Sequence, residues 1–400
     1  MFFLPFSEAL PRTAYVLWTL LSLALLVLPL LGRSRPQTGP LVWIFASLLA
    51  IVGILSSSTN AEDVQWHLIT GVQLLAFLLL GPFGLRKLVA NHPRSITVGV
   101  AAFMAGQSVS AMAAFAQILG IPVFGYKALL GRAPGLAGHP NLLGIFAAIA
   151  LVVSVYGLCR EGKKAWLLLS LLVNVGGLLV SGSVSALIAA GIGILVVMIS
   201  ARAPLKVPLL IAGGAALSLW ALVQLTAETE LFRGPVQRIL QVTGQTNQLS
   251  TLDIRENTYA FAWDGIQKDP LFGAGLDDGS GATYDYITLT HNVLLRSWFQ
   301  GGLGLFSAFA LIYIAAVCLI VRSLVKGRDA SSAGVLAVLV SFSMTSAALQ
   351  QGYFWILILG AWALIEPTRQ RPHGDPIRVD SIGLTNEEGR PGALHASYSR

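Results

Sequence analysis

The chain has 400 residues, of which 55% belong to the set AVILMFWYC and only 11% are charged. Soluble domains carry about 25% charged residues, so this composition excludes a soluble globular protein. The abundant Leu, Val and Ile exclude a disordered chain, and two Cys exclude a disulfide scaffold. A polytopic membrane protein remains, so the net charge of +7 is interpreted by position rather than as a nucleic-acid footprint, and no nucleic-acid partner is expected.

Apolar segments long enough, or nearly long enough, to cross a bilayer as helices recur along the chain. There are eleven of them, at about 14–31, 40–57, 67–85, 95–119, 141–158, 165–181, 183–200, 207–225, 298–321, 331–349 and 352–365. The fold class expected from them is all-α, a polytopic transmembrane helical bundle of about 11 spans with one long external loop that contains short helices.

The Lys and Arg residues predict the orientation. Thirteen of the 26 lie in five short alternate loops, five more lie in the C-terminal tail, and eight lie on the opposite side. Because basic loops stay in the cytoplasm, the pattern predicts an external N-terminus and a cytoplasmic C-terminus. We therefore expect a multi-pass protein of the cytoplasmic (inner) membrane.

The spans and loops divide the chain into four parts. Residues 1–225 form an N-terminal transmembrane bundle of about eight spans, and 226–290 form a periplasmic or extracytoplasmic loop. Residues 291–365 supply the C-terminal transmembrane helices. Residues 366–400 are rich in Pro and Gly and lack apolar periodicity, which predicts a disordered cytoplasmic tail.

The long external loop concentrates polar chemistry, since it holds nine of the nineteen acidic residues. Within it, 253–268 places Ile254, Tyr259, Ala262, Trp263 and Ile266 at near-helical spacing. This pattern predicts a helix that lies on the membrane surface or packs in a bundle. Asp269-Pro270 should end that helix, and the glycines that follow should form a tight turn.

A polar junction precedes the next apolar segment. Thr290 or Asn292 can cap a helix, and Gly301-Gly302 permits a break or close packing. His291 therefore stands at the outer membrane boundary, where an imidazole suits proton transfer because its pKa lies near ambient pH. The alternative is an interfacial His that only caps the helix.

Several motifs together resemble the O-antigen ligase / O-antigen polymerase superfamily. They cover about 135–325, and two further stretches, GLAGHPNLLG and SGSVSALIAAG, look like the family's Pro-Asn helix start and Ser-rich hairpin. The ordered residues of the main loop are Arg255, Trp263, Pro270, Gly273, Gly275, His291, Asn292, Gly301, Gly302 and Gly304. Two departures stand out: Val184 follows Ser183 where the family commonly has an Arg after a Ser, and eleven spans are counted where the family tends to about twelve.

The resemblance implies a GT-C-like fold and a metal-independent, inverting glycosyltransferase without a cofactor. Its donor would be an undecaprenyl-diphosphate-linked glycan, its acceptor a lipid or glycan hydroxyl, and membrane lipids would surround it. Arg255 would grip the diphosphate, because a guanidinium matches phosphate oxygens, and His291 would deprotonate or orient the acceptor. For Arg255, the alternative is a salt bridge to Asp253, Glu256 or another acid of the loop.

The remaining external cations are candidate diphosphate ligands. Lys127 and Arg132 would replace the missing hairpin Arg, and Arg296 would either bind an anion or snorkel to the interface. Arg233 and Arg238 would bind phosphate or lipid head groups. His139 is expected to cap the helix that starts at Pro140.

The remaining acidic and histidine residues of the external loops are assigned to structure. Asp277-Asp278 would form a Gly-rich turn rather than hold a divalent cation. Glu62, Asp63 and His67 are expected to be solvated. Two further functions remain open: an O-antigen or exopolysaccharide polymerase, and a transporter or flippase for a lipid-linked glycan.

Overall fold

The computed structural model describes residues 1–6, 41–128, 131–161, 164–204, 251–277 and 288–365, together with isolated residues between 13 and 30 and positions 213 and 284. In these ranges the chain is helical and contains no β-strand, only two isolated bridges. The described helices belong to one compact unit, Met1–Glu366. The fold class expected from the sequence, a helical membrane protein, is confirmed.

Four helical stretches are long and apolar enough to cross a membrane: Val64–Asn91, Arg94–Ile118, Pro140–Arg160 and Val293–Lys326. The first consists of α3 (Val64–Leu75), a π-helical turn η2 (Ala76–Leu80) and α4 (Gly81–Asn91). The others are α5 (Pro93–Ile118), α6 (Pro140–Glu161) and α12 (Val293–Lys326). Shorter apolar helices are α2 (Leu41–Ser57), α7 (Ala165–Ser181), α8 (Val184–Ser200), α13 (Ala330–Ser343) and α14 (Gly352–Ile365).

Nine of the eleven predicted apolar segments are therefore helical, whereas 14–31 and 207–225 lie outside the continuously described ranges. Several boundaries differ from the expectation: α12 extends beyond 298–321 at both ends, and α13 ends at Ser343 rather than near 349. The helix predicted to end at residue 85 runs on through Arg86 and Lys87 to Asn91, because both side chains are good helix formers and a proline follows only at position 93.

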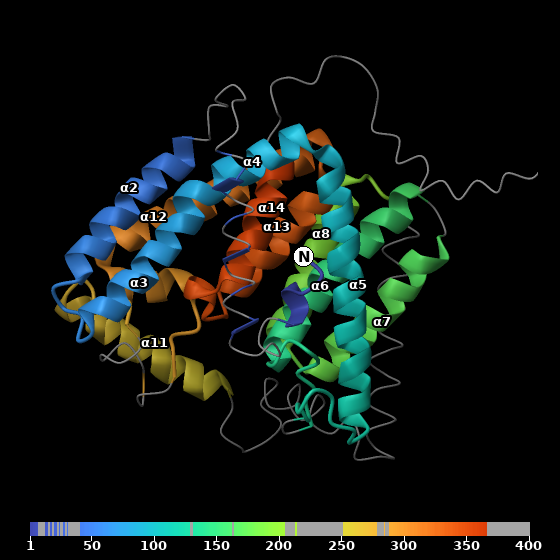
Figure 1. Ribbon diagram of the computed structural model, residues 1–400, viewed down its shortest axis with the longest axis horizontal. Coiled ribbons are helices and arrows are strands. Elements are labelled where there is room, and N and C mark those ends of the chain that lie inside the picture. Colours follow the sequence, from blue (N-terminus) through green and yellow to red (C-terminus); the bar gives the residue numbers. More distant parts are fainter. Residues whose placement is uncertain are drawn as a thin grey trace, which may run out of the picture. The chain divides into compact units, whose positions relative to one another are not determined.

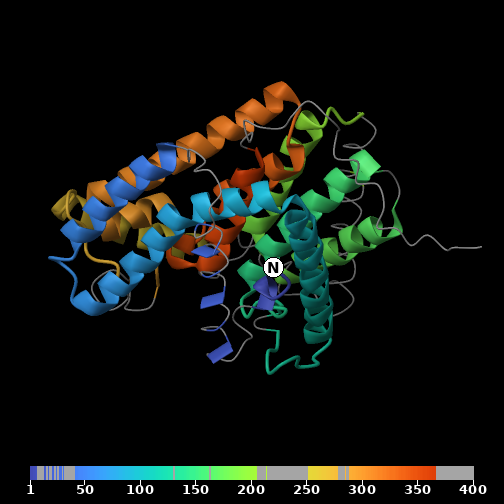
Figure 2. The same ribbon diagram turned by 45° about the horizontal axis from the view of Figure 1, so that its top comes forward.

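Helices α2 and α12 lie side by side (Figures 1 and 2). Their backbones approach closely at glycines: a Cβ on Gly53 would lie 2.4 Å from Leu305 N, and one on Gly304 would lie 2.7 Å from Gly53 N. Small residues at such crossings allow the packing that associates membrane helices. The N-terminal and C-terminal helices consequently share one core.

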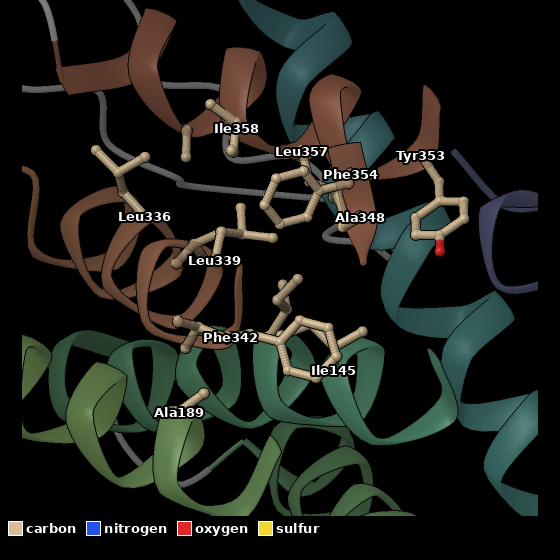
Figure 3. Packing of buried hydrophobic residues seen from close by; sticks show 14 of the residues in the cluster. Ile145, Ala189, Leu336, Leu339, Phe342, Ala348, Tyr353, Phe354, Leu357 and Ile358 are labelled. Atoms are coloured by element: carbon tan, nitrogen blue, oxygen red, sulfur yellow. The ribbon is translucent and has the colours of Figure 1, made fainter. Parts of the chain in front are cut away.

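Helix α6 lies at the centre of this core and contacts α5, α7, α8 and α13. Ile145 of α6 and Ala189 of α8 face Leu339 and Phe342 of α13 (Figure 3). Above them, Phe354 and Ile358 of α14 close the cluster (Figure 3). This packing fixes the ends of α6, α8 and α12, from which the candidate site is built.

Candidate functional site

Helix α11 (Thr251–Lys268) is the helix that the structure describes in the polar segment between α8 and α12. The sequence predicted this helix and its end before Pro270, and both are confirmed. Ala262 and Ile266 are buried against Phe299 at the start of α12, whereas Ile254 and Trp263 are exposed. The packed face of α11 is thus narrower than the apolar pattern indicated, and it fixes α11 on α12.

The start of α12 is broken as the Gly301-Gly302 pair predicts. Asn292 caps the helix by accepting from Leu295 N at 3.0 Å, and Gly302 has φ 61° and ψ −165°, which is not helical. The turn after α11 fills this break. Ala274 N donates to Phe299 O at 2.8 Å, Gly275 N to Gln300 O at 2.9 Å, and Leu303 N to Leu271 O at 3.2 Å.

We call residues 269–277 the clasp, because other elements also hold them. Asn60 Nδ2 donates to Asp269 Oδ2 at 2.7 Å and to Gly273 O at 2.9 Å. Leu276 N donates to His67 Nδ1 at 2.8 Å, and His67 Nε2 contacts Ile54 O at 2.8 Å, so the ring is the neutral Nε2–H tautomer. His67 is 0% exposed, so the expectation that it is solvated is wrong, while Glu62 and Asp63 are exposed as expected.

Two side chains of α11 reach from this scaffold toward neighbouring elements. Arg255 Nη2 donates to Ser185 Oγ in the first turn of α8 at 3.2 Å, and among the described residues it makes no ion pair with Asp253 or Glu256. One helical turn later, the Tyr259 hydroxyl donates to His291 O at 2.8 Å and lies 3.5 Å from Met344 O. Arg255 and His291 are thus brought to one place from segments 36 positions apart in the numbering.

The loop before α6 brings two more polar side chains to the same place. Arg132 donates from Nε to Ser181 O at 2.8 Å and from Nη2 to Asn141 Oδ1 at 2.8 Å. Its guanidinium therefore lies on the α7–α8 hairpin, beside Ser181. His139 accepts from Asn141 N at 3.1 Å, which is the predicted capping contact.

Electrostatic effects link these residues into a His–Arg cluster of Arg132, His139, Arg255 and His291. Burial, Arg255 and Arg296 lower the pKa of His291 below 6.5, although a backbone hydrogen bond at Leu289 opposes them. Part of the His139 ring reaches solvent, yet the surrounding protein, Arg132 and His291 lower its pKa as well. Both imidazoles are therefore held toward the neutral form, which can accept a proton.

Three helices begin at the cluster: α6 at Pro140, α8 at Val184 and α12 at Val293. A helix N-terminus carries partial positive charge and backbone N–H groups that attract anions. Arg132 and Arg255 add two full charges beside them. The arrangement suits an anionic group next to a proton acceptor.

Residues 167–310 match the family model described as O-antigen ligase. This match supports membership of the O-antigen ligase superfamily. A search of curated proteins finds no match. The matched O-antigen ligase region contains the hairpin, Arg255 and His291, whereas Arg132 and His139 precede it. Membership and the apolar helices support a multi-pass membrane protein with a glycosyltransferase-type activity and lipid-linked glycan substrates.

The other predicted cations of this O-antigen ligase relative are placed differently. Arg296 is 1% exposed and donates to Gln300 Oε1 at 2.7 Å and to Ala347 O at 2.9 Å, so it points into the protein and does not snorkel. Lys127 is exposed in the loop before Arg132. Arg233 and Arg238 lie outside the described residues, as does the predicted tail 366–400.

Asp277 of the predicted Gly-rich turn belongs to the clasp. It is 2% exposed, and its Oδ2 accepts from Asp63 N at 3.3 Å, while Asp278 lies outside the described ranges. Asp277 therefore ties the turn to the start of α3.

Sequence reasoning missed two contacts of the site. Tyr259 was assigned to an apolar helix face and Ser185 to a hairpin helix, but both bond to the two central residues. The signal for Tyr259 was its position four residues after Arg255, which places both on one face of a helix. For Ser185 no local signal exists, since its partner lies 70 residues away.

Proposed function

We propose that the protein transfers a glycan from an undecaprenyl-diphosphate-linked donor to an acceptor hydroxyl, on the outer face of the cytoplasmic membrane, as an O-antigen ligase-like enzyme. The observation that carries the proposal is the His–Arg cluster at the starts of three helices. It combines cations for a diphosphate with an imidazole that is kept neutral.

The donor's diphosphate would lie against Arg255 and the N-terminal turn of α8. A guanidinium presents parallel N–H groups that match two phosphate oxygens, and the half-buried setting of Arg255 strengthens this attraction. Ser185 holds the guanidinium through its hydroxyl without neutralising it. Arg255 would thus stabilise the charge that grows on the leaving diphosphate.

Arg132 would extend the cationic surface from the hairpin and so take the place of the missing Arg at Val184. Arg296 would add charge at short range from inside the protein. Lys127, Arg233 and Arg238 are assigned to the entering lipid-linked donor as further candidate ligands. The contacts of Arg132 with Ser181 and Asn141 support its position on the hairpin.

His291 would take the proton of the acceptor hydroxyl as its oxygen attacks C1 of the first sugar. The new O–C1 bond forms while the C1–O bond to the diphosphate breaks, and the electron pair leaves with undecaprenyl diphosphate. Attack opposite the leaving group inverts C1. His291 takes the proton, and the cations stabilise the negative charge on the leaving diphosphate. The step therefore requires no metal.

The basic cytoplasmic loops support an orientation in which α11 and the cluster lie outside. An external N-terminus and a cytoplasmic C-terminus follow from it. Membrane lipids would surround α2, α7 and α8, whose exposed side chains include Leu48, Leu168 and Ile188.

The test uses purified protein in nanodiscs and separates binding from transfer. Arg255→Ala should weaken binding of undecaprenyl diphosphate about 10²-fold, since it removes a charge-assisted fork. His291→Ala should leave that binding unchanged and reduce glycan transfer in complemented cells about 10²–10⁴-fold. Full surface glycan from both folded variants would refute the mechanism, and Lys268→Ala, at the far end of α11, is the control.

A polymerase of the same superfamily would share the donor and the cluster, and would differ only in using another repeat unit as acceptor. The glycan formed in complemented cells distinguishes them, because a polymerase yields longer chains in place of a capped anchor. A flippase would move the donor without releasing undecaprenyl diphosphate, so release of this product argues against it.

A further inference from the structure

We infer that Tyr259 is a positioning residue that sets His291 against Arg255. The inference rests on the proposed function, because it concerns how these two residues act together. The inference goes beyond the proposed function because it assigns a role to the Tyr259 hydroxyl. This hydroxyl lies between α11, which carries Arg255, and the segment before α12, which carries His291.

The first support is the position of Tyr259 on α11. Arg255 and Tyr259 are four residues apart, so their side chains leave the same face of the helix. They are close enough to affect each other's ionisation, since Arg255 lowers the pKa of the tyrosine while burial, the larger effect, raises it. With its pKa raised overall, the Tyr259 hydroxyl stays protonated at neutral pH and keeps its role as a donor.

The second support is the target of that donor. The hydroxyl lies 2.8 Å from the backbone oxygen of His291, a short bond between groups 32 residues apart in the chain. It also lies 3.5 Å from Met344 O, the residue that ends α13. The hydroxyl has one proton, which it donates to His291 O, and it therefore joins α11 to the segment before α12, with Met344 O as a near neighbour.

The third support is that His291 lies outside the helices that flank it. It precedes the cap residue Asn292 and stands outside α12, so helical hydrogen bonds do not fix its peptide, although the ring has a backbone hydrogen bond at Leu289. The cluster of Ala262, Ile266 and Phe299 already fixes α11 on α12. The Tyr259 bond extends this docking to the backbone of His291, from the helix face that also carries Arg255.

A catalytic base loses rate steeply when it is misplaced, and errors near 1 Å cost up to about 10²-fold. We expect Tyr259→Phe, which removes one oxygen atom, to lower the turnover number about tenfold. Binding of undecaprenyl diphosphate should stay within about twofold, because Arg255 and Ser185 are untouched. A structural role for the hydroxyl would instead change both quantities together.

The matched control is Tyr156→Phe. Tyr156 is half-buried on α6, about 24 Å of helix from Pro140 at the cluster end, so the same oxygen is removed far from His291. Turnover in this variant should equal that of the wild type. Equal turnover of Tyr259→Phe and wild type would overturn the inference, as would a parallel loss of undecaprenyl diphosphate binding.

A fluorinated tyrosine at position 259 covers the case in which the Phe variant does not fold. Fluorination makes the hydroxyl more acidic while keeping its shape, so the protein folds at low pH with the bond intact. As pH rises, the fluorinated hydroxyl loses its proton and can no longer donate to His291 O. Turnover should then fall at a pH where the wild type is unaffected. A pH profile identical to that of the wild type would contradict the inference.

The proposed function is checked in the same assay by His291→Ala. If this variant keeps full transfer, the proposed function fails and Tyr259 has nothing to position. If His291→Ala abolishes transfer while Tyr259→Phe does not alter it, only the inference about Tyr259 fails.

Discussion

The clasp and the His–Arg cluster meet opposite ends of α11, and they use polar groups in opposite ways. In the clasp, the backbone and acidic groups are bonded to Asn60, His67, Phe299 and Gln300. In the cluster, Arg255 donates to one hydroxyl and the imidazoles are held neutral. Among the described residues, the clasp uses most of its polar groups in internal hydrogen bonds, with Asp277 Oδ1 as an exception, whereas the cluster leaves His291 Nδ1 available to a ligand.

This difference separates two kinds of motif residue. Pro270, Gly273 and Gly302 recur beside Arg255 and His291 in the sequence pattern, but their contacts build the scaffold. Substitutions in the clasp should therefore act on stability, while substitutions in the cluster should act on transfer. Measurements that separate the two quantities test this distinction directly.

Gly302→Ala should produce the largest loss of stability. A Cβ at this position would lie 2.1 Å from Leu271 O, and the backbone angles of φ 61° and ψ −165° are essentially open only to glycine. Strain and overpacking together should cost about 2–6 kcal/mol. The yield of monodisperse protein in detergent and its thermal unfolding measure the effect.

Gly191→Ala is the matched control, since a Cβ there meets nothing within 4 Å. It lies in the middle of α8, where alanine favours a helix by about 1 kcal/mol. A Gly302→Ala protein as stable as this control would show that the break in α12 tolerates side chains and that the clasp does not depend on it.

His67→Phe should have the next largest effect, again on stability. The ring is fully buried and bonds both Leu276 N and Ile54 O, so phenylalanine leaves a buried donor and a buried acceptor without partners. Each costs about 1–3 kcal/mol. The melting temperature in detergent should fall, while the affinity for undecaprenyl diphosphate per folded molecule should hold.

Gln65→Ala, an exposed position two residues earlier, controls for changes to α3 itself. If His67→Phe weakened ligand binding without lowering the melting temperature, His67 would belong with the cluster and the distinction between the two regions would be lost.

Sequence patterns predicted the elements that local preferences determine. The helix 253–268, its end before Pro270 and the break at Gly301-Gly302 all follow from periodicity, proline and glycine. The buried state of His67 did not follow, because its partner Leu276 lies 209 residues away and only the folded chain brings them together. The burial of Arg296 did not follow either, because its acceptor Ala347 is supplied by a distant segment.

The candidate site was predictable in part. Arg255 and His291 were selected from the predicted topology together with the motifs that resemble the O-antigen ligase superfamily. Their approach to each other through Ser185 and Tyr259 required tertiary structure, since these contacts span 70 and 32 residues. Residue chemistry thus identified candidates, and packing determined which of them meet.

The pH dependence of transfer should show the smallest effect and the sharpest distinction between the regions. Burial and the charges of Arg255 and Arg296 disfavour the imidazolium of His291, so its pKa lies below 6.5. The neutral base is then retained as pH falls through 6.5, and the rate should decline only at lower pH. Arg255→Gln removes one of these charges, so the pKa of His291 should rise and the acidic limb of the residual activity should move to higher pH. Arg296 still disfavours the imidazolium of His291 in this variant, and the pKa of His139 stays lowered by burial and Arg132. His67→Phe changes the clasp alone and should leave the midpoint where it is in the wild type. The profile of kcat/KM against pH, which reports the free enzyme, tests this in nanodiscs for the three proteins, and an Arg255→Gln midpoint at or below that of the wild type would remove His291 from the role of base.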